Sequence, residues 1–97
     1  MKMPAFSVRV TPHGERLVKA LNKQHPDFIA HYERAIHVLS SDPYNRTRSH
    51  QIKKLKNISA GQGTWRLRLG RWRFRYDIWD QQVELSYCGL RREETYR

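Results

Sequence analysis

The stretch TWRLRLGRWRFRYDIWDQQVELSYC, residues 64–88, decides the fold of this chain. Apolar and polar residues alternate along it, and two pairs of turn-forming residues interrupt the alternation. Gly70-Arg71 fits the Gly-X pattern of a two-residue type II′ hairpin turn, and Asp80-Gln81 can form a second two-residue turn. The stretch therefore predicts three antiparallel strands.

The two turns also predict which residues face each other. The first turn gives the pairs Leu69–Trp72, Leu67–Phe74 and Trp65–Tyr76, and the second gives Ile78–Val83, Tyr76–Leu85 and Phe74–Tyr87. Because paired residues share a sheet face, all these side chains fall on one side of the sheet. That side is the predicted core.

The opposite face of the predicted sheet collects arginines. The same register pairs Arg68 with Arg73 and Arg66 with Arg75, and it places Cys88 opposite Arg73. Like charges directly opposite each other destabilise a sheet by about 0.2–1 kcal/mol per pair, and arginine keeps its proton at physiological pH. Guanidinium groups bind phosphate well, so the arrangement favours an anion site. The alternative is that long arginines spread into water and cover the face.

Composition points to a polyanionic partner. The chain has 97 residues, enough for one domain, with a net charge of +10. Ten Lys or Arg and no acidic residue lie between Pro43 and Tyr76. Nucleic acid is the first expectation, with an anionic membrane surface or an acidic protein as alternatives. The sequence shows no apolar run for a membrane span and no signal-peptide core, so we expect a cytoplasmic protein that does not enter a membrane.

The first half of the chain predicts one strand and two helices. Phe6, Val8 and Val10 alternate in a strand over residues 5–10, and Thr11-Pro12 begins a helix that ends near Lys23. A second helix follows His25-Pro26-Asp27 and ends at residues 40–43. The expected fold class is α+β: an N-terminal strand and a two-helix antiparallel hairpin packed on a mainly antiparallel sheet, with a C-terminal three-stranded meander. Residues 1–97 form a single domain.

Residues 44–63 read as a long basic connector. Ile52, Leu55 and Ile58 are spaced three apart, which predicts a turn or two of helix around residues 51–57. The connector either extends the anion site or is a solvated loop. The histidines lack the spacing of a metal site on one helix, so no metal and no other cofactor is expected.

Lys54-Leu55 and the run GTWRLRLGRWRFRY, residues 63–76, together resemble the centre of the RelE/ParE toxin superfamily. The shared pattern is a Leu, a Gly, an aromatic residue, a basic-apolar-basic triplet, a Gly, and an aromatic-Arg-apolar-x-Tyr run. Gly89-Leu90-Arg91 with Tyr96 is similar to the RelE branch, whose members end the last strand with an Arg followed by a Tyr. The helical half resembles the family only in the order and length of its elements.

The resemblance implies a toxin of a type II toxin–antitoxin system, an mRNA interferase that depends on the ribosome. Such an endoribonuclease cleaves messenger RNA by attack of a ribose 2′-hydroxyl on the adjacent phosphate. Its partners would be the ribosome, messenger RNA and an acidic antitoxin, with operator DNA bound only through the antitoxin complex.

Family roles transfer to five residues of this chain. Arg66 and Arg68 match the basic pair before the central Gly, and Arg73 matches the phosphate-binding Arg. Arg91 matches the Arg that acts as acid or charge stabiliser, and Tyr96 the Tyr that stacks on the substrate base. Further RNA contacts are expected from these basic residues: His50, Lys53, Lys54, Lys56 and Arg75.

Two departures from the family leave alternatives open. The best-known RelE-type site has lysines at the positions of Arg66 and Arg68, and an arginine cannot serve as the general base. His50, Lys53, Lys54 or the ribosome would then take that role. The spacing from Arg91 to Tyr96 is also one residue shorter than in that type. A ParE-like inhibitor of DNA gyrase and a non-catalytic nucleic-acid-binding module are the other two functions that the sequence allows.

Overall fold

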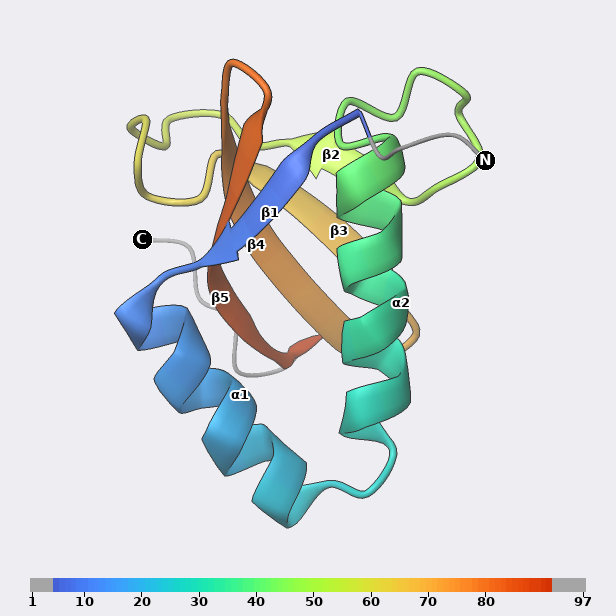
Figure 1. Ribbon diagram of the computed structural model, residues 1–97, viewed down its shortest axis with the longest axis vertical. Helices are drawn as coiled ribbons and strands as arrows, with labels where there is room; N and C mark the ends of the chain where they lie inside the picture. The colour runs from blue at the N-terminus through green and yellow to red at the C-terminus, as the bar shows by residue number, and fades with distance from the viewer. Residues whose placement is uncertain (1–4, 92–97) are drawn as a thin grey trace.

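A five-stranded sheet and two helices make up the structure, a computed structural model that describes residues 5–91 (Figure 1). The elements are β1 (Ser7–Val10), α1 (Pro12–Gln24), α2 (Phe28–Ser41), β2 (Ile52–Lys54), β3 (Trp65–Leu69), β4 (Trp72–Trp79) and β5 (Gln82–Leu90). The strand order is β1-β5-β4-β3-β2, and neighbouring strands are antiparallel except β1 and β5, which are parallel. The predicted α+β fold class is confirmed.

The β3–β4 hairpin has the predicted register. Leu69 pairs with Trp72, and both predicted arginine pairs form, Arg66 with Arg75 and Arg68 with Arg73. Gly70 has a φ of 59°, as the first turn position of a type II′ hairpin requires. The local turn chemistry and the long-range pairing therefore agree in this part of the sheet.

The β4–β5 pairing departs from the prediction beyond Leu85. Tyr76 pairs with Leu85 as expected, but the register then shifts by one residue, and Ser86 has no partner on β4. Phe74 consequently pairs with Cys88 instead of Tyr87. The prediction that Cys88 lies opposite Arg73 is wrong as well. A β-bulge explains both corrections, because one extra residue in a strand moves every later side chain to the other face.

The predicted helix around residues 51–57 is also wrong, because Ile52–Lys54 forms the edge strand β2. Arg68 N–H donates to the Gln51 carbonyl oxygen at 2.9 Å, and Leu55 N–H donates to the Thr64 carbonyl oxygen at 2.7 Å. Pairing with β3 thus satisfies the backbone of this segment. A helix of one or two turns is costly to nucleate and forms fewer backbone hydrogen bonds for that cost.

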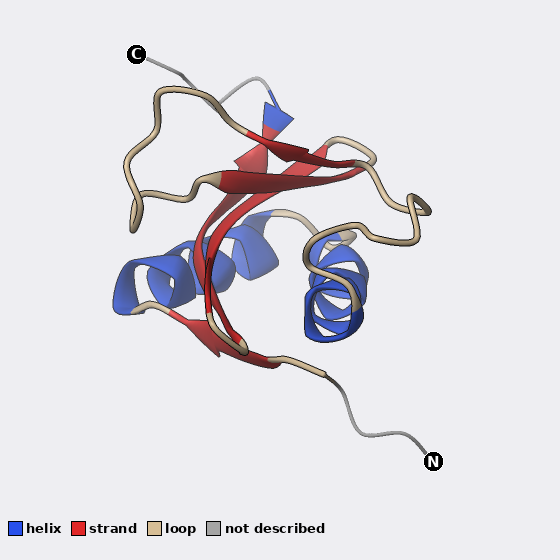
Figure 2. Ribbon diagram, turned by 90° about the horizontal axis from the view of Figure 1, so that it is seen from above, coloured by secondary structure: helices blue, strands red, loops and turns tan. Residues whose placement is uncertain are grey.

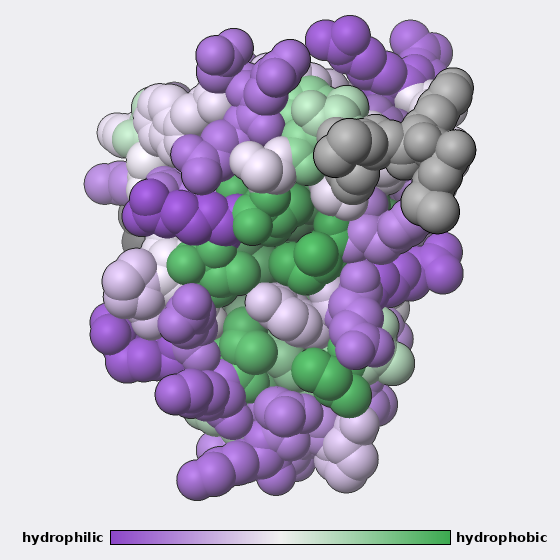
Figure 3. All heavy atoms as spheres, viewed as in Figure 1, coloured by the Kyte–Doolittle hydropathy of each residue, from purple (hydrophilic) through white to green (hydrophobic). Residues whose placement is uncertain are grey.

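The helices supply the other half of the core. Thr11 caps α1 by accepting a hydrogen bond from Gly14 N–H at 3.0 Å, as predicted. Phe28 and Leu39 of α2 are fully buried against the apolar face of the sheet, which curves around α2 (Figure 2). The face in Figure 3 shows apolar side chains at the surface between the helices. Leu17 of α1 and Ile36 of α2 are only partly buried against the core. Within residues 5–91 no helix has the length and apolarity to cross a membrane.

Two polar contacts fix the helical layer against the sheet. The Asp27 carboxylate accepts hydrogen bonds from Arg71 Nη2 at 2.8 Å and from Trp72 Nε1 at 3.0 Å, which joins the start of α2 to the β3–β4 turn. These hydrogen bonds lower the pKa of Asp27 to about 2. On the buried side, the Tyr76 hydroxyl donates to the Pro43 carbonyl oxygen at 2.7 Å and holds the segment after α2.

Candidate nucleic-acid interface

A row of cationic side chains crosses the face of the sheet opposite the helices. Lys53 of β2 pairs with Arg66 of β3, Arg66 pairs with Arg75 of β4, and Arg75 pairs with Tyr87 of β5. These four residues are called the basic row. Neighbouring strands lie about 4.8 Å apart, so the three cations span roughly 10 Å along the row. Tyr87 ends the row with an aromatic ring.

A second pair of arginines lies beside the basic row, nearer the β3–β4 turn, and its two members differ in environment. Arg73 is only 3% exposed, and its Nη1 donates to the carbonyl oxygens of Gly70 at 2.8 Å and Trp72 at 3.0 Å. Arg68, directly opposite, is exposed. Backbone carbonyls therefore compensate part of the charge of Arg73, while Arg68 presents its charge to solvent.

The guanidinium group of Arg75 donates hydrogen bonds to the loop that precedes β3. Its Nε and Nη2 donate to the Gly63 carbonyl oxygen at 3.1 and 3.0 Å, and Nη2 also donates to the Gln62 carbonyl oxygen. Gly63 has a φ of 78°, and a Cβ there would lie 2.9 Å from Arg75 Cβ. The close approach of the loop to β4 therefore depends on this glycine.

The buried carboxylate of Asp77 anchors the same loop. Asp77 is 2% exposed and accepts four hydrogen bonds: three at Oδ1, from Gly61 N, Thr64 N and Thr64 Oγ1, and one at Oδ2, from Gly63 N. Four donors compensate the desolvation of this charge. Asp77 thereby fixes the loop over one end of the sheet, and the loop borders the basic row on that side.

A groove beside the row combines positive charge with apolar surface. It has a volume of about 410 Å³ and is lined by Lys53, Lys56 and Arg66, with Leu55 and Ile58 as its apolar part. Lysine and arginine bind phosphates, and apolar surface accommodates bases. The groove brings together two of the residues predicted for RNA contacts, Lys53 and Lys56, and the predicted catalytic residue Arg66.

Tyr87 is the member of the row that the sequence prediction missed, because the predicted register placed it in the core. The bulge at Ser86 turns it to the basic side, where its ring lies against Gly89; a Cβ on Gly89 would collide with the Tyr87 hydroxyl. A signal for this exists in the sequence. The apolar alternation of Val83 and Leu85 resumes one residue late, at Cys88 and Leu90.

Two predicted RNA contacts lie away from the basic row. Lys54 pairs with Trp65 on the helix side of the sheet, with its Nζ 5.7 Å from the centre of the Trp65 ring. His50 lies in a pocket beside α2, with its Nε2 3.8 Å from Asp42 Oδ2. Neither residue is placed to act together with the row, so His50 and Lys54 lose support as candidates for the general base.

The predicted C-terminal residues fall at the border of the described chain. Arg91 is exposed and continues the pairing of β5, since its N–H donates to the Arg71 carbonyl oxygen at 2.9 Å. It lies two residues beyond Gly89, which pairs with Arg73. Arg91 is thus close to the arginine face in the sheet register. Tyr96 lies outside the described residues.

Cys88 belongs to the core and not to the interface. It is 1% exposed, and burial raises the pKa of its thiol to about 12. Such a thiol is not a nucleophile at neutral pH. Within residues 5–91 no three His, Cys, Asp or Glu side chains gather in a group that could hold a metal ion.

Comparisons of the chain with protein-family models, with curated proteins and with solved structures find no match. The similarity to the RelE/ParE superfamily therefore stays a prediction.

Proposed function

We propose that this protein is an endoribonuclease toxin that cleaves messenger RNA on the ribosome and is neutralised by an acidic antitoxin. The observation that carries the proposal is the basic row, in which Lys53, Arg66 and Arg75 follow one another across three strands. Adjacent like charges destabilise a sheet. A surface that keeps them is suited to a ligand with several negative charges, as the RNA backbone has.

Cleavage by 2′-hydroxyl attack needs charge stabilisation, a proton acceptor and a proton donor. Arg66 and Arg68, with Arg91 near the same face, would stabilise the negative charge on the phosphate in the transition state. Lys53 and Tyr87 are the members of the row whose residue types can exchange a proton, which the arginines cannot. We assign Lys53 as the first candidate for the general base, since it lies directly opposite Arg66.

One observation favours a second candidate function, a non-catalytic RNA-binding module. Arg73, expected to bind the reacting phosphate, is buried and donates to two backbone carbonyls. A role for Arg73 in holding the β3–β4 turn would leave the arginine face as a binding surface only. Variants of Arg73 are therefore poor tests, because they disturb the turn as well as the charge.

The test is expression of the chain alone in cells, followed by mapping of RNA 5′ ends on a translated message. The variants are Arg66→Gln and Lys53→Met, with Arg16→Gln on the exposed side of α1 as the matched control. Loss of a charge-stabilising donor lowers a catalytic rate by about 10²–10³. We expect cuts within translated regions that both interface variants lose and the control keeps.

Each other outcome selects a different function. Intact messages together with double-strand DNA breaks would support a ParE-like inhibitor of gyrase. Intact messages without growth arrest would leave the binding module. Equal cutting by the wild-type protein and both interface variants would show that the basic row is not the site.

A further inference from the structure

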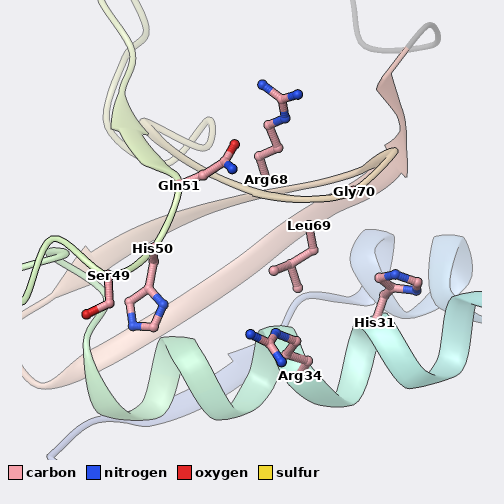
Figure 4. Close-up of a pocket in the computed structure, with 8 residues that line it drawn as sticks. All are labelled: His31, Arg34, Ser49, His50, Gln51, Arg68, Leu69 and Gly70. Atoms are coloured by element: carbon pink, nitrogen blue, oxygen red, sulfur yellow. The ribbon is translucent and has the colours of Figure 1, made fainter.

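A second cationic pocket lies at the edge of the sheet, on the helix side. It has a volume of about 430 Å³ and is called the edge pocket (Figure 4). Its lining residues are His31 and Arg34 of α2, Ser49, His50 and Gln51 of the segment before β2, and Arg68, Leu69 and Gly70 at the end of β3. His50 and Arg34 point toward each other from opposite walls in Figure 4, and Leu69 points toward α2 between them.

Arg68 connects the edge pocket to the basic face. It lines the pocket, yet its side chain points to the opposite side of β3 from Leu69 (Figure 4). The edge strand β2 pairs only with residues 65–67 of β3, so the last two residues of β3 have no β2 partner. At Arg68 the segment before β2 still covers this edge, because Arg68 N–H donates to the Gln51 carbonyl oxygen at 2.9 Å. A chain bound along the basic face can therefore pass around the sheet edge only beyond this contact, at Leu69 and the exposed Gly70.

The charges in the edge pocket are those of an anion site. Arg34, Arg68 and two histidines line it, although the side chain of Arg68 points to the other side of β3, and the lining within residues 5–91 includes no acidic side chain. His50 Nε2 lies 3.8 Å from Asp42 Oδ2, outside the lining of the pocket. His31 Nδ1 donates to the Asp27 carbonyl oxygen at 2.9 Å, which orients the imidazole ring. Arg34 is exposed and has no ion-pair or hydrogen-bond partner among the described residues.

We propose that the edge pocket is a second RNA subsite, in which Arg34 binds a backbone phosphate of the strand that leaves the basic face past Arg68. The ligand is the sugar–phosphate backbone of single-stranded RNA. The inference rests on the proposed function, because the same strand has to occupy the basic row. The subsite adds a contact remote from the bond that is cleaved, so the affinity for RNA would depend on the length of the RNA.

The experiment measures binding of 2′-O-methyl RNA, which cannot undergo 2′-hydroxyl attack, by fluorescence anisotropy over a range of salt concentrations. Oligonucleotides of increasing length are used, starting from a dinucleotide, whose single phosphodiester can occupy only one of the two places. Arg34→Gln and Arg34→Glu are compared with Arg16→Gln and Arg16→Glu, which make the same charge changes on α1. Thermal unfolding of each variant checks that the fold is intact.

For long oligonucleotides we expect Arg34→Gln to weaken binding about tenfold and to reduce the slope of log K against log salt by about 0.7, the value for one phosphate contact in a single strand. The dinucleotide should occupy the basic row, where three cations lie together, and should therefore bind the Arg34 and Arg16 variants equally. Equal affinities at every length, no binding of RNA by the wild-type protein, or an effect of Arg34 only on binding to an acidic protein would each overturn the subsite.

The failure of this subsite is distinguishable from the failure of the proposed function. If the wild-type protein cuts messages but the Arg34 variants bind RNA like the Arg16 controls, only the subsite is refuted. If the wild-type protein binds RNA with the expected dependence on length and on Arg34 but cuts no message, the subsite is supported and the nuclease activity is refuted.

Discussion

Replacement of Asp77 by asparagine tests how the loop over the sheet is held. The substitution keeps the shape of the side chain, and the amide oxygen can still accept the three hydrogen bonds made at Oδ1. The amide nitrogen, however, would face Gly63 N–H, which donates to Oδ2 at 2.8 Å in a buried position. Two donors then oppose each other, and one buried N–H group loses its acceptor.

The expected cost follows from these contacts. A hydrogen bond to a charged group contributes about 1.5–3 kcal/mol, and an unsatisfied buried donor costs about 1–3 kcal/mol. Because the three remaining bonds also lose their charge, we expect Asp77→Asn to lower the free energy of unfolding by about 3 kcal/mol. This is a large part of the roughly 5–15 kcal/mol that stabilises a typical domain.

Urea unfolding of Asp77→Asn and of a matched control measures this cost. Asp80→Asn is the control, because Asp80 is exposed in the β4–β5 turn and the same substitution there should change stability by less than about 0.5 kcal/mol. Hydrogen exchange at the Gly63 and Thr64 amides should accelerate in Asp77→Asn only. The reasoning would be refuted if both variants were as stable as the wild-type protein.

Three further predictions concern single residues. Since hydrogen bonds from Arg71 and Trp72 lower the pKa of Asp27 from 3.8 to about 2, its contribution to stability is complete above pH 3.8 and is lost as the pH falls through about 2. The difference in unfolding free energy between the wild-type protein and Asp27→Asn should shrink over that interval, and a difference independent of pH would contradict this assignment. Cys88, whose burial raises its pKa to about 12, should react with a thiol reagent at the rate of global unfolding; rapid labelling of the folded protein would place it at the surface. Gly63→Ala should destabilise the protein by more than about 1 kcal/mol, because alanine disfavours a φ of 78° and its Cβ would meet Arg75; calorimetry that finds an unchanged melting temperature would argue against this loop geometry.

The sequence was sufficient to predict the β3–β4 hairpin and the start of α1. Gly70 fixes the turn, and the apolar alternation on both sides requires the same register, so two independent determinants agree. Thr11 and Pro12 similarly begin α1 through contacts within a few residues. Where local chemistry and the hydrophobic pattern point to one answer, prediction succeeds.

Other parts of the fold and of the interface depend on partners that are distant in the chain. Residues 52–54 pair with β3 instead of forming the helix predicted around residues 51–57, and the bulge at Ser86 turns Tyr87 to the basic side. Arg73 is buried and donates to carbonyl oxygens at the turn, and the alternation of residues cannot indicate these contacts. Likewise, the edge pocket joins a helix, a loop and a strand end that have no common sequence motif.

The parallel pairing of the first strand with the last has a consequence for biosynthesis. Ser7 pairs with Gln82, so β1 leaves the ribosome long before its partner has been made. Contacts between such distant residues slow folding, and Phe6, Val8 and Val10 stay without their packing partners on β5 until then. The nascent chain also lacks Tyr87, the last residue of the row. A protein that we propose attacks translated messages therefore completes its own site only after β5 has been synthesised.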